Sequence, residues 1–87
     1  MGAARRQTPK YLGKKLKQVR EHLGIKTYDE MIARLNVKEA SLYRASISQY
    51  EKGTREPPLN VLLRYARLAG VSMETLVDDE LDLPKDF

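Results

Sequence analysis

The sequence has no cysteine and only one histidine, His22, among its 87 residues. Without cysteine, neither a disulfide framework nor a thiolate metal site can support the fold, which is compatible with a reducing compartment. No other metal-ligand spacing and no glycine-rich phosphate-binding loop is present, and the acidic residues do not converge on one place. We therefore expect a protein that is not an enzyme and has no metal or cofactor, with His22 at the surface or partly packed.

Long apolar runs are also missing from the sequence. The first thirty residues contain no continuous apolar stretch, so we expect no signal peptide, no membrane span and a cytoplasmic location. No alternating strand pattern and no internal repeat occurs, which favours an all-α fold. A chain of this length forms one domain with a modest core and little room for an enclosed pocket.

The charge is divided unevenly along the chain, although the formal net charge is only +4. Residues 1–69 hold fifteen lysines and arginines against six acidic residues, whereas residues 70–87 hold one lysine against six acidic residues. A basic body of this kind is typical of proteins that bind a polyanion, because neutralising phosphates releases counterions. The same composition also fits a solvated charged surface with a solubilising tail, so charge alone does not decide between the two.

Apolar residues at helical spacing, together with capping signals, predict five short helices around one core. The first begins with Thr8 as N-cap and Pro9 as its first residue, carries one apolar stripe and ends at Gly24. That stripe consists of Leu12, Leu16, Val19 and Leu23. The second helix lies between a capping box that starts at Thr27 and a turn near Asn36.

The third helix follows an ambiguous stretch, residues 37–46, and its pattern is clear from Arg44 onward. A proline pair then marks a loop, and the fourth helix runs from about Pro58 to Ala69, with Gly70 as its terminator. Ser72 caps the fifth helix. We expect the inward side of the fourth helix to consist of Leu59, Leu62, Leu63, Ala66 and Leu68.

The second and third predicted helices, with the turn between them, form the arrangement that enters the major groove of DNA. The reading helix must expose polar side chains to base edges, while its other side must be apolar so that the unit packs rigidly. Ile47 and Tyr50 meet the second requirement. The side chains that meet the first are Arg44, Ala45, Ser46, Ser48, Gln49 and Lys52.

A family resemblance is carried by residues 47–53, whose sequence is ISQYEKG, followed by Arg55 and Pro57. This segment resembles the I-S-x-x-E-x-G…P signature of the Cro/C1-type helix-turn-helix family, also called the XRE family. The similarity continues through residues 62–72 and covers roughly residues 10–77. It implies a lambda-repressor-like compact bundle and a transcriptional regulator that binds double-stranded DNA sequence-specifically. Repression, action at the nucleoid and homodimerisation are the expected finer properties.

The resemblance also implies roles for individual residues. In the family, an arginine late in the first helix pairs with the glutamate of the signature; here these are Arg20 and Glu51, with two independent surface charges as the competing interpretation. Base contacts are expected from Arg44, Ala45, Ser46, Ser48 and Gln49. Phosphate contacts are expected from Thr27, Tyr28, Tyr43, Lys52, Thr54 and Arg55. Dimer contacts are expected from Met73, Leu76 and Val77.

Among the expected base contacts, arginine suits guanine and glutamine suits adenine, because each can form two hydrogen bonds at once. Ala45 is suited to a thymine methyl group, and Ser46 and Ser48 would assist. For each of these residues, contact with phosphate or solvent alone is the competing interpretation.

The sequence departs from the family pattern in and before the turn. Ile32 stands where the family has alanine, and Asn36 stands where it has glycine. Ile47 lies ten positions after Val37, a spacing about five longer than in the family. If Leu42 takes the place of the family's valine, the extra residues are 37–41 and the turn is lengthened. Such a turn either adds backbone contacts to DNA, through Lys38, or is a neutral surface loop.

We divide the chain into a flexible basic arm (1–7), a DNA-binding domain (8–77) and an acidic tail (78–87). Arg5 and Arg6 of the arm, with Lys10, either follow the DNA backbone or minor groove or take no part. The tail either packs on the body, joins a dimer interface or binds another protein, on the side away from DNA. The main alternative function is therefore an antitoxin that binds DNA and neutralises a partner protein through this tail. RNA binding is a weaker alternative, because no aromatic stacking platform is visible.

Overall fold

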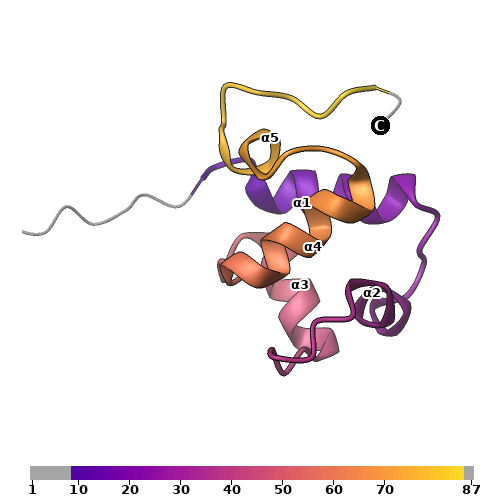
Figure 1. Ribbon diagram of the computed structural model, residues 1–87. Coiled ribbons are helices and arrows are strands. Elements are labelled where there is room, and N and C mark those ends of the chain that lie inside the picture. Colours follow the sequence, from indigo (N-terminus) through magenta and orange to yellow (C-terminus); the bar gives the residue numbers. More distant parts are fainter. Residues whose placement is uncertain (1–8, 86–87) are drawn as a thin grey trace, which may run out of the picture.

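Five helices form the computed structural model of the chain, which describes residues 9–85 (Figure 1). They are α1 (Leu12–His22), α2 (Tyr28–Leu35), α3 (Arg44–Lys52), α4 (Leu59–Ala69) and α5 (Met73–Val77). No strand occurs within these residues, so the prediction of an all-α bundle of five short helices is confirmed. None of the helices in this range combines the length and the apolar character that crossing a membrane requires.

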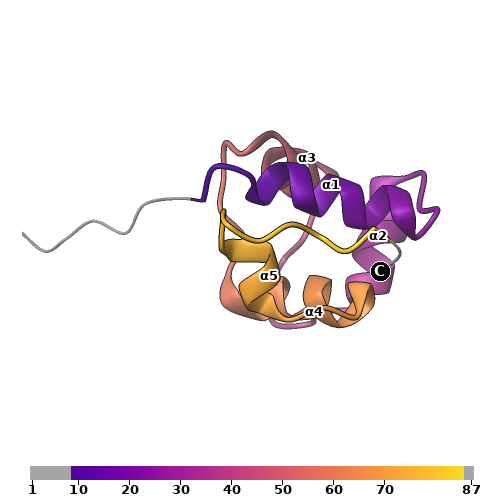
Figure 2. The same ribbon diagram turned by 90° about the horizontal axis from the view of Figure 1, so that it is seen from above.

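The helices are arranged so that α2 and α3 lie at one end of the molecule and the C-terminal segment lies at the other (Figure 1). α1 packs against α3, α4 and α5, and α2 packs against α3 and α4. Seen from above, the C-terminal segment runs between α1 and the α4–α5 pair (Figure 2). α1 is therefore the central support, with α3 on one side of it and the C-terminal segment on another.

The ends of α2 and α3 follow the predicted capping signals. The Thr27 hydroxyl accepts a hydrogen bond from the amide of Glu30 at 3.1 Å, which satisfies one of the free amides in the first turn of α2. Asn36 ends that helix in the left-handed conformation, with a φ of 50°. Gly53 ends α3 in the same conformation, with a φ of 77°, which costs glycine nothing because it has no Cβ.

The start of α1 was predicted wrongly. A helix beginning at Pro9 was expected, but α1 begins at Leu12 with Tyr11 as its N-cap, and Thr8 lies outside the described residues. A long-range contact holds the residues just before the helix: the Asp79 carboxylate accepts hydrogen bonds from the amides of Lys10 at 2.9 Å and Tyr11 at 3.1 Å. An acidic group from the other end of the chain thus lies beside the start of α1, where it complements the positive end of the helix.

The lengthened turn is present, and apolar side chains hold it at both of its ends. Val37 is buried in the core, and Leu42 is partly buried against it. Between them the chain makes a turn in which the amide of Ala40 donates to the carbonyl of Val37 at 3.4 Å. Val37 is therefore part of the core as well as Leu42, and residues 38–41 are what extends the turn.

The core is built from one face of every helix together with Ile25 and Val37. On α4 the inward face differs from the prediction. Leu59 and Leu63 are exposed, and the buried residues are Val61, Leu62, Tyr65, Ala66 and Ala69. These five form one helical stripe, and burying it turns positions 59 and 63 outward. The prediction gave leucine too much weight against valine and tyrosine.

The C-terminal segment packs back on α1, which was one of the three arrangements left open for it. Besides the contact of Asp79, the Lys15 ammonium donates to the carbonyls of Thr75 and Asp78, each at 2.8 Å. Lys15 is only 4% exposed, and Leu83 packs against the core beside it. A cation at these carbonyls satisfies orphan acceptors and the negative end of α5. Asp86 and Phe87 of the acidic tail lie outside the described residues.

Candidate nucleic-acid interface

Arg20 of α1 and Glu51 of α3 form a two-pronged ion pair. The Arg20 Nε donates to Glu51 Oε2 at 2.6 Å, and Nη2 donates to Oε1 at 3.1 Å. The third arm of the guanidinium, Nη1, donates to the carbonyl of Ile25 at 3.0 Å. The two side chains are 12% and 5% exposed. The glutamate raises the pKa of Arg20 above its ordinary value, so the arginine stays charged.

The same pair of helices makes a close backbone contact at Gly13. A Cβ at this position would lie 2.7 Å from the Glu51 carbonyl oxygen and 2.8 Å from that of Tyr50. α1 therefore lies directly on the last turn of α3, and only glycine fits between them. The sequence analysis did not single out Gly13, although an isolated glycine inside a helical pattern is a recognised signal of close packing.

The residues expected to contact bases do not all lie on the open side of α3. Arg44, Ala45 and Gln49 are exposed, and Ser48 is partly buried. Ser46 is buried, and its hydroxyl accepts a hydrogen bond from the amide of Tyr43 at 3.2 Å. The Ser46 hydroxyl thus caps the start of α3 from within and is not on the surface of the helix. Ile47 and Tyr50 are buried in the core, as a docked reading helix requires.

The residues expected to contact phosphate flank α3 on two sides. At the start of α2, Thr27 is exposed, and the Tyr28 ring lies under the Arg20 guanidinium, with 5.2 Å between the Arg20 Cζ and the ring centroid. Tyr43, the N-cap of α3, is one of the most exposed large side chains of the described residues.

Lys52, Thr54 and Arg55 follow at the other end of α3 and are exposed. The amide of Thr54 donates to the carbonyl of Gln49 at 3.0 Å, which holds this loop against the helix. The Arg55 Cζ lies 5.9 Å from the centroid of the Tyr50 ring, a cation–π distance.

A second arginine–carboxylate pair, which the sequence analysis missed, joins the start of α2 to the start of α3. The Arg44 Nε donates to Asp29 Oδ1 at 2.9 Å, and Nη2 donates to Oδ2 at 2.7 Å. Unlike the first pair, its side chains are 75% and 60% exposed. The guanidinium lowers the pKa of Asp29 below its ordinary value. No signal in the sequence gave the distance between these positions, because the lengthened turn left the angle between α2 and α3 open.

The expected dimer residues on α5 lie mainly against their own chain. Leu76 is fully buried in the core, whereas Met73 and Val77 are partly buried against it. Leu76 is therefore not on the surface that a second chain would meet. Of the residues expected in a basic arm, Arg5 and Arg6 lie outside the described residues, and Lys10 is exposed with its amide bonded to Asp79.

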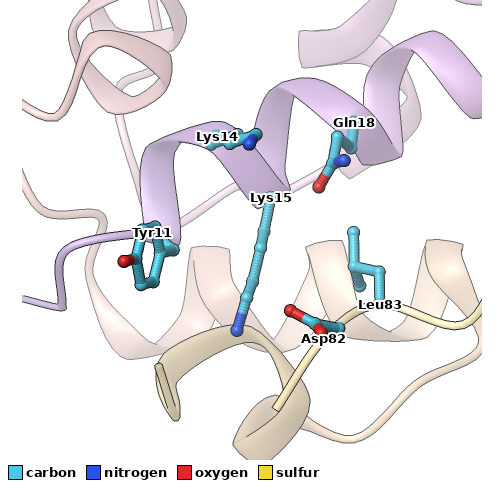
Figure 3. Close-up of a pocket in the computed structure, with 6 residues that line it drawn as sticks. All are labelled: Tyr11, Lys14, Lys15, Gln18, Asp82 and Leu83. Carbon is cyan, nitrogen blue, oxygen red and sulfur yellow. The ribbon is translucent and has the colours of Figure 1, made fainter. Parts of the chain in front are cut away.

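One cleft lies away from α3, between α1 and the C-terminal segment (Figure 3). It has a volume of about 240 Å³ and is lined by Tyr11, Lys14, Lys15, Gln18, Asp82 and Leu83. Figure 3 shows Lys15 extending from α1 toward α5. Its ammonium donates a hydrogen bond to the Thr75 carbonyl at the end of that helix. The cleft is below the usual size of a small-molecule site.

Comparison with known proteins gives one match. A family model described as a helix-turn-helix domain matches residues 13–81, which include all five helices except the first residue of α1. No curated protein and no solved structure gives a significant match to the chain. The resemblance found in the sequence is thus confirmed at the level of the helix-turn-helix domain.

Proposed function

Since the chain belongs to the helix-turn-helix domain family, a family of DNA-binding transcription regulators, we propose that it recognises a specific sequence in double-stranded DNA by inserting α3 into the major groove. The observation that carries the proposal is the enclosed Arg20–Glu51 pair at the last turn of α3. It ties that turn to α1 and so holds the exposed residues of the helix in place. A reading helix needs such rigid support, because base-edge hydrogen bonds depend on exact placement.

Base reading is assigned to the exposed residues in the first two turns of α3. Arg44 is suited to guanine O6 and N7, Gln49 to adenine N6 and N7, and Ala45 to a thymine methyl group. Ser48 assists from its partly buried position, whereas Ser46, which is buried and bonded to the Tyr43 amide, is left out of this set.

Phosphate contacts are assigned to the residues that flank α3, which fix the register of the helix in the groove. Thr27, Tyr28 and Tyr43 serve one strand, where the amide ends of α2 and α3 also favour an anion. Lys52, Thr54 and Arg55 serve the other. The C-terminal acidic segment supports this orientation, since it lies at the opposite end of the molecule (Figure 1).

The proposal further includes that the protein acts as a homodimeric repressor at the nucleoid. Two reading helices on a dimer double the number of base contacts, which gives a small module useful specificity. Met73 and Val77, on the surface of α5, are the expected dimer contacts that are not fully buried. Selected DNA sites with two half-sites about 10 base pairs apart, or a multiple of that, support a dimer, whereas single half-sites contradict it.

The experiment that tests the function is selection of bound sequences from a random DNA pool at moderate salt. We expect one enriched sequence for the wild type and loss of preference at one guanine for Arg44→Ala. Lys52→Ala is the matched control: it should weaken binding to all sequences about equally and reduce the salt slope by about one. A wild-type chain without any sequence preference contradicts the proposal.

An antitoxin remains the second candidate, and the exposed Leu81 between two acidic residues of the C-terminal segment favours it. An apolar side chain in that setting suits a basic partner protein. Co-purification of a stoichiometric partner that is lost when residues 80–87 are deleted supports this candidate. A full chain that co-purifies with no stoichiometric partner contradicts it.

A further inference from the structure

The exposed ion pair between Arg44 and Asp29 lies where base reading is proposed. Both side chains are mostly exposed, yet the arginine is held in one geometry by two hydrogen bonds. Ion pairs this exposed contribute little to folding stability, so stability does not account for the arrangement. Its location at the start of the reading helix does suggest a reason, because that is the part of α3 that reaches the bases.

The edge of the guanidinium that Asp29 uses is the important detail. The carboxylate accepts from Nε and Nη2, so it occupies one lateral edge of the planar guanidinium. A guanidinium has five N–H groups, and those that remain are both on Nη1 and one on Nη2. One N–H of Nη1 and the remaining N–H of Nη2 form the far end of the fork, which can donate two parallel bonds to O6 and N7 of guanine.

We propose that Asp29 is a specificity-determining residue, which holds Arg44 by its Nε–Nη2 edge and thereby aims its Nη1–Nη2 edge at a guanine. This inference rests on the proposed function. A free arginine side chain is long and adopts many rotamers, most of which reach phosphates or water. The carboxylate restricts Arg44 to few of them before DNA is bound, and its charge discourages the arginine from binding phosphate.

The central test compares Asp29→Asn with the wild type by selection from a random DNA pool. We expect the preference for guanine at one position to fall about tenfold, while the other positions keep theirs. Binding to non-specific DNA should strengthen, and its salt slope should rise by about one, because the released arginine becomes free to bind a phosphate. Asp29→Glu keeps the carboxylate and should restore part of the guanine preference.

The matched control is Glu30→Gln, in the same first turn of α2. It removes the same charge from the same helix end, but Arg44 is paired with Asp29 and not with Glu30. This control variant should keep the guanine preference. A double-mutant cycle adds Arg44→Lys, which lacks the fork: in that background Asp29→Asn should cause no further loss. Circular dichroism of each variant verifies that it is folded.

The outcomes separate this inference from the function on which it rests. If the wild type has no sequence preference, the proposed function fails. If the wild type has one and Asp29→Asn keeps it at every position, Asp29 is not a specificity determinant. Equal losses in Asp29→Asn and Glu30→Gln would assign the effect to charge at the helix end. Tighter binding with an unchanged preference would make Asp29 a competitor of DNA. Each of the last three results overturns the inference.

Discussion

The two ends of α3 use the same chemistry in different surroundings. At its last turn, Arg20 and Glu51 form an ion pair with side chains 12% and 5% exposed. At its first turn, Arg44 and Asp29 form an ion pair with side chains 75% and 60% exposed. Both pairs are two-pronged and both join α3 to another helix. The difference lies in the surrounding medium, because water weakens the attraction between charges that it surrounds.

This difference in exposure matches two roles: the enclosed pair holds α3 in place, and the exposed pair belongs to the surface proposed to recognise DNA. An enclosed charge that loses its partner is left without solvation, so the inner pair locks α3 to α1. The outer pair loses little when it opens, since water replaces the partner. One helix can therefore be fixed at its last turn and still have an arginine available at its first turn.

The largest expected effect comes from breaking the inner pair. Glu51→Gln leaves the Arg20 guanidinium mostly enclosed without its counter-charge, and we expect a loss of about 2–3 kcal/mol in the free energy of unfolding. Urea denaturation measures it. Glu39→Gln, on the exposed turn before α3, is the control and should change little. A loss as small as that of the control would mean that the inner pair does not secure α3.

A similar loss, somewhat smaller, is expected for Gly13→Ala. The new methyl group would meet the Tyr50 and Glu51 carbonyl oxygens at under 3 Å, so α1 and α3 must move apart, at a cost of about 1–3 kcal/mol. The displaced α3 should also bind DNA more weakly. Gln18→Ala, on the exposed side of α1, provides the comparison in the same unfolding experiment. Unchanged stability would show that the contact is not tight.

Lys15 extends the comparison to an enclosed cation whose partners are carbonyls. Lys15→Met keeps most of the apolar stem but leaves the Thr75 and Asp78 carbonyls without their donor, for an expected loss of about 1–2 kcal/mol. Lys14→Met, exposed on the neighbouring position, is the control. DNA sequence preference should stay the same, because this contact is remote from α3. A change of preference would argue against separate roles for the two ends of the molecule.

The contribution of Asp79 should depend on pH. Its hydrogen bonds from the Lys10 and Tyr11 amides lower its pKa below the ordinary value of 3.8. A lowered pKa in the folded state means stability that is present above the unfolded pKa and lost as the pH falls through the folded one. The wild type should thus exceed Asp79→Asn in urea midpoint at pH 7, and the difference should shrink below about pH 4. A difference that grows in acid would contradict this assignment.

The smallest effect on stability is expected at the outer pair. Asp29→Asn should leave the urea midpoint nearly unchanged at moderate salt, although it alters DNA preference. Measuring the urea midpoints of Asp29→Asn and Glu51→Gln side by side compares the two ion pairs most directly. If both variants lost similar stability, exposure would not be what distinguishes the ion pairs at the two ends of α3.

Local signals predicted the fold well because they depend on neighbouring residues. The capping side chain of Thr27, the left-handed Asn36 and the terminating Gly53 all lie where the sequence indicated. The pairing of Arg20 with Glu51 was predicted from the family resemblance instead, since no local rule connects residues on different helices. The DNA contacts expected of individual residues stay predictions.

Contacts between distant segments were beyond the sequence. Asp79 bonds the Tyr11 amide, 68 residues away, and Asp29 meets Arg44 across a turn of unusual length. The inward position of Tyr65 was also missed, because a hydroxyl counts against burial. That hydroxyl has no hydrogen-bond partner among residues 9–85, and burial raises the pKa of Tyr65.

The turn before α3 has a practical consequence. Val37 and Leu42 hold the two ends of the turn, and Ala40 between them also packs against the core. The exposed positions of the turn are Lys38, Glu39 and Ser41. These three can be exchanged or labelled without removing a core contact, and under the proposed function a fluorescent label there would report on DNA binding at the neighbouring α3.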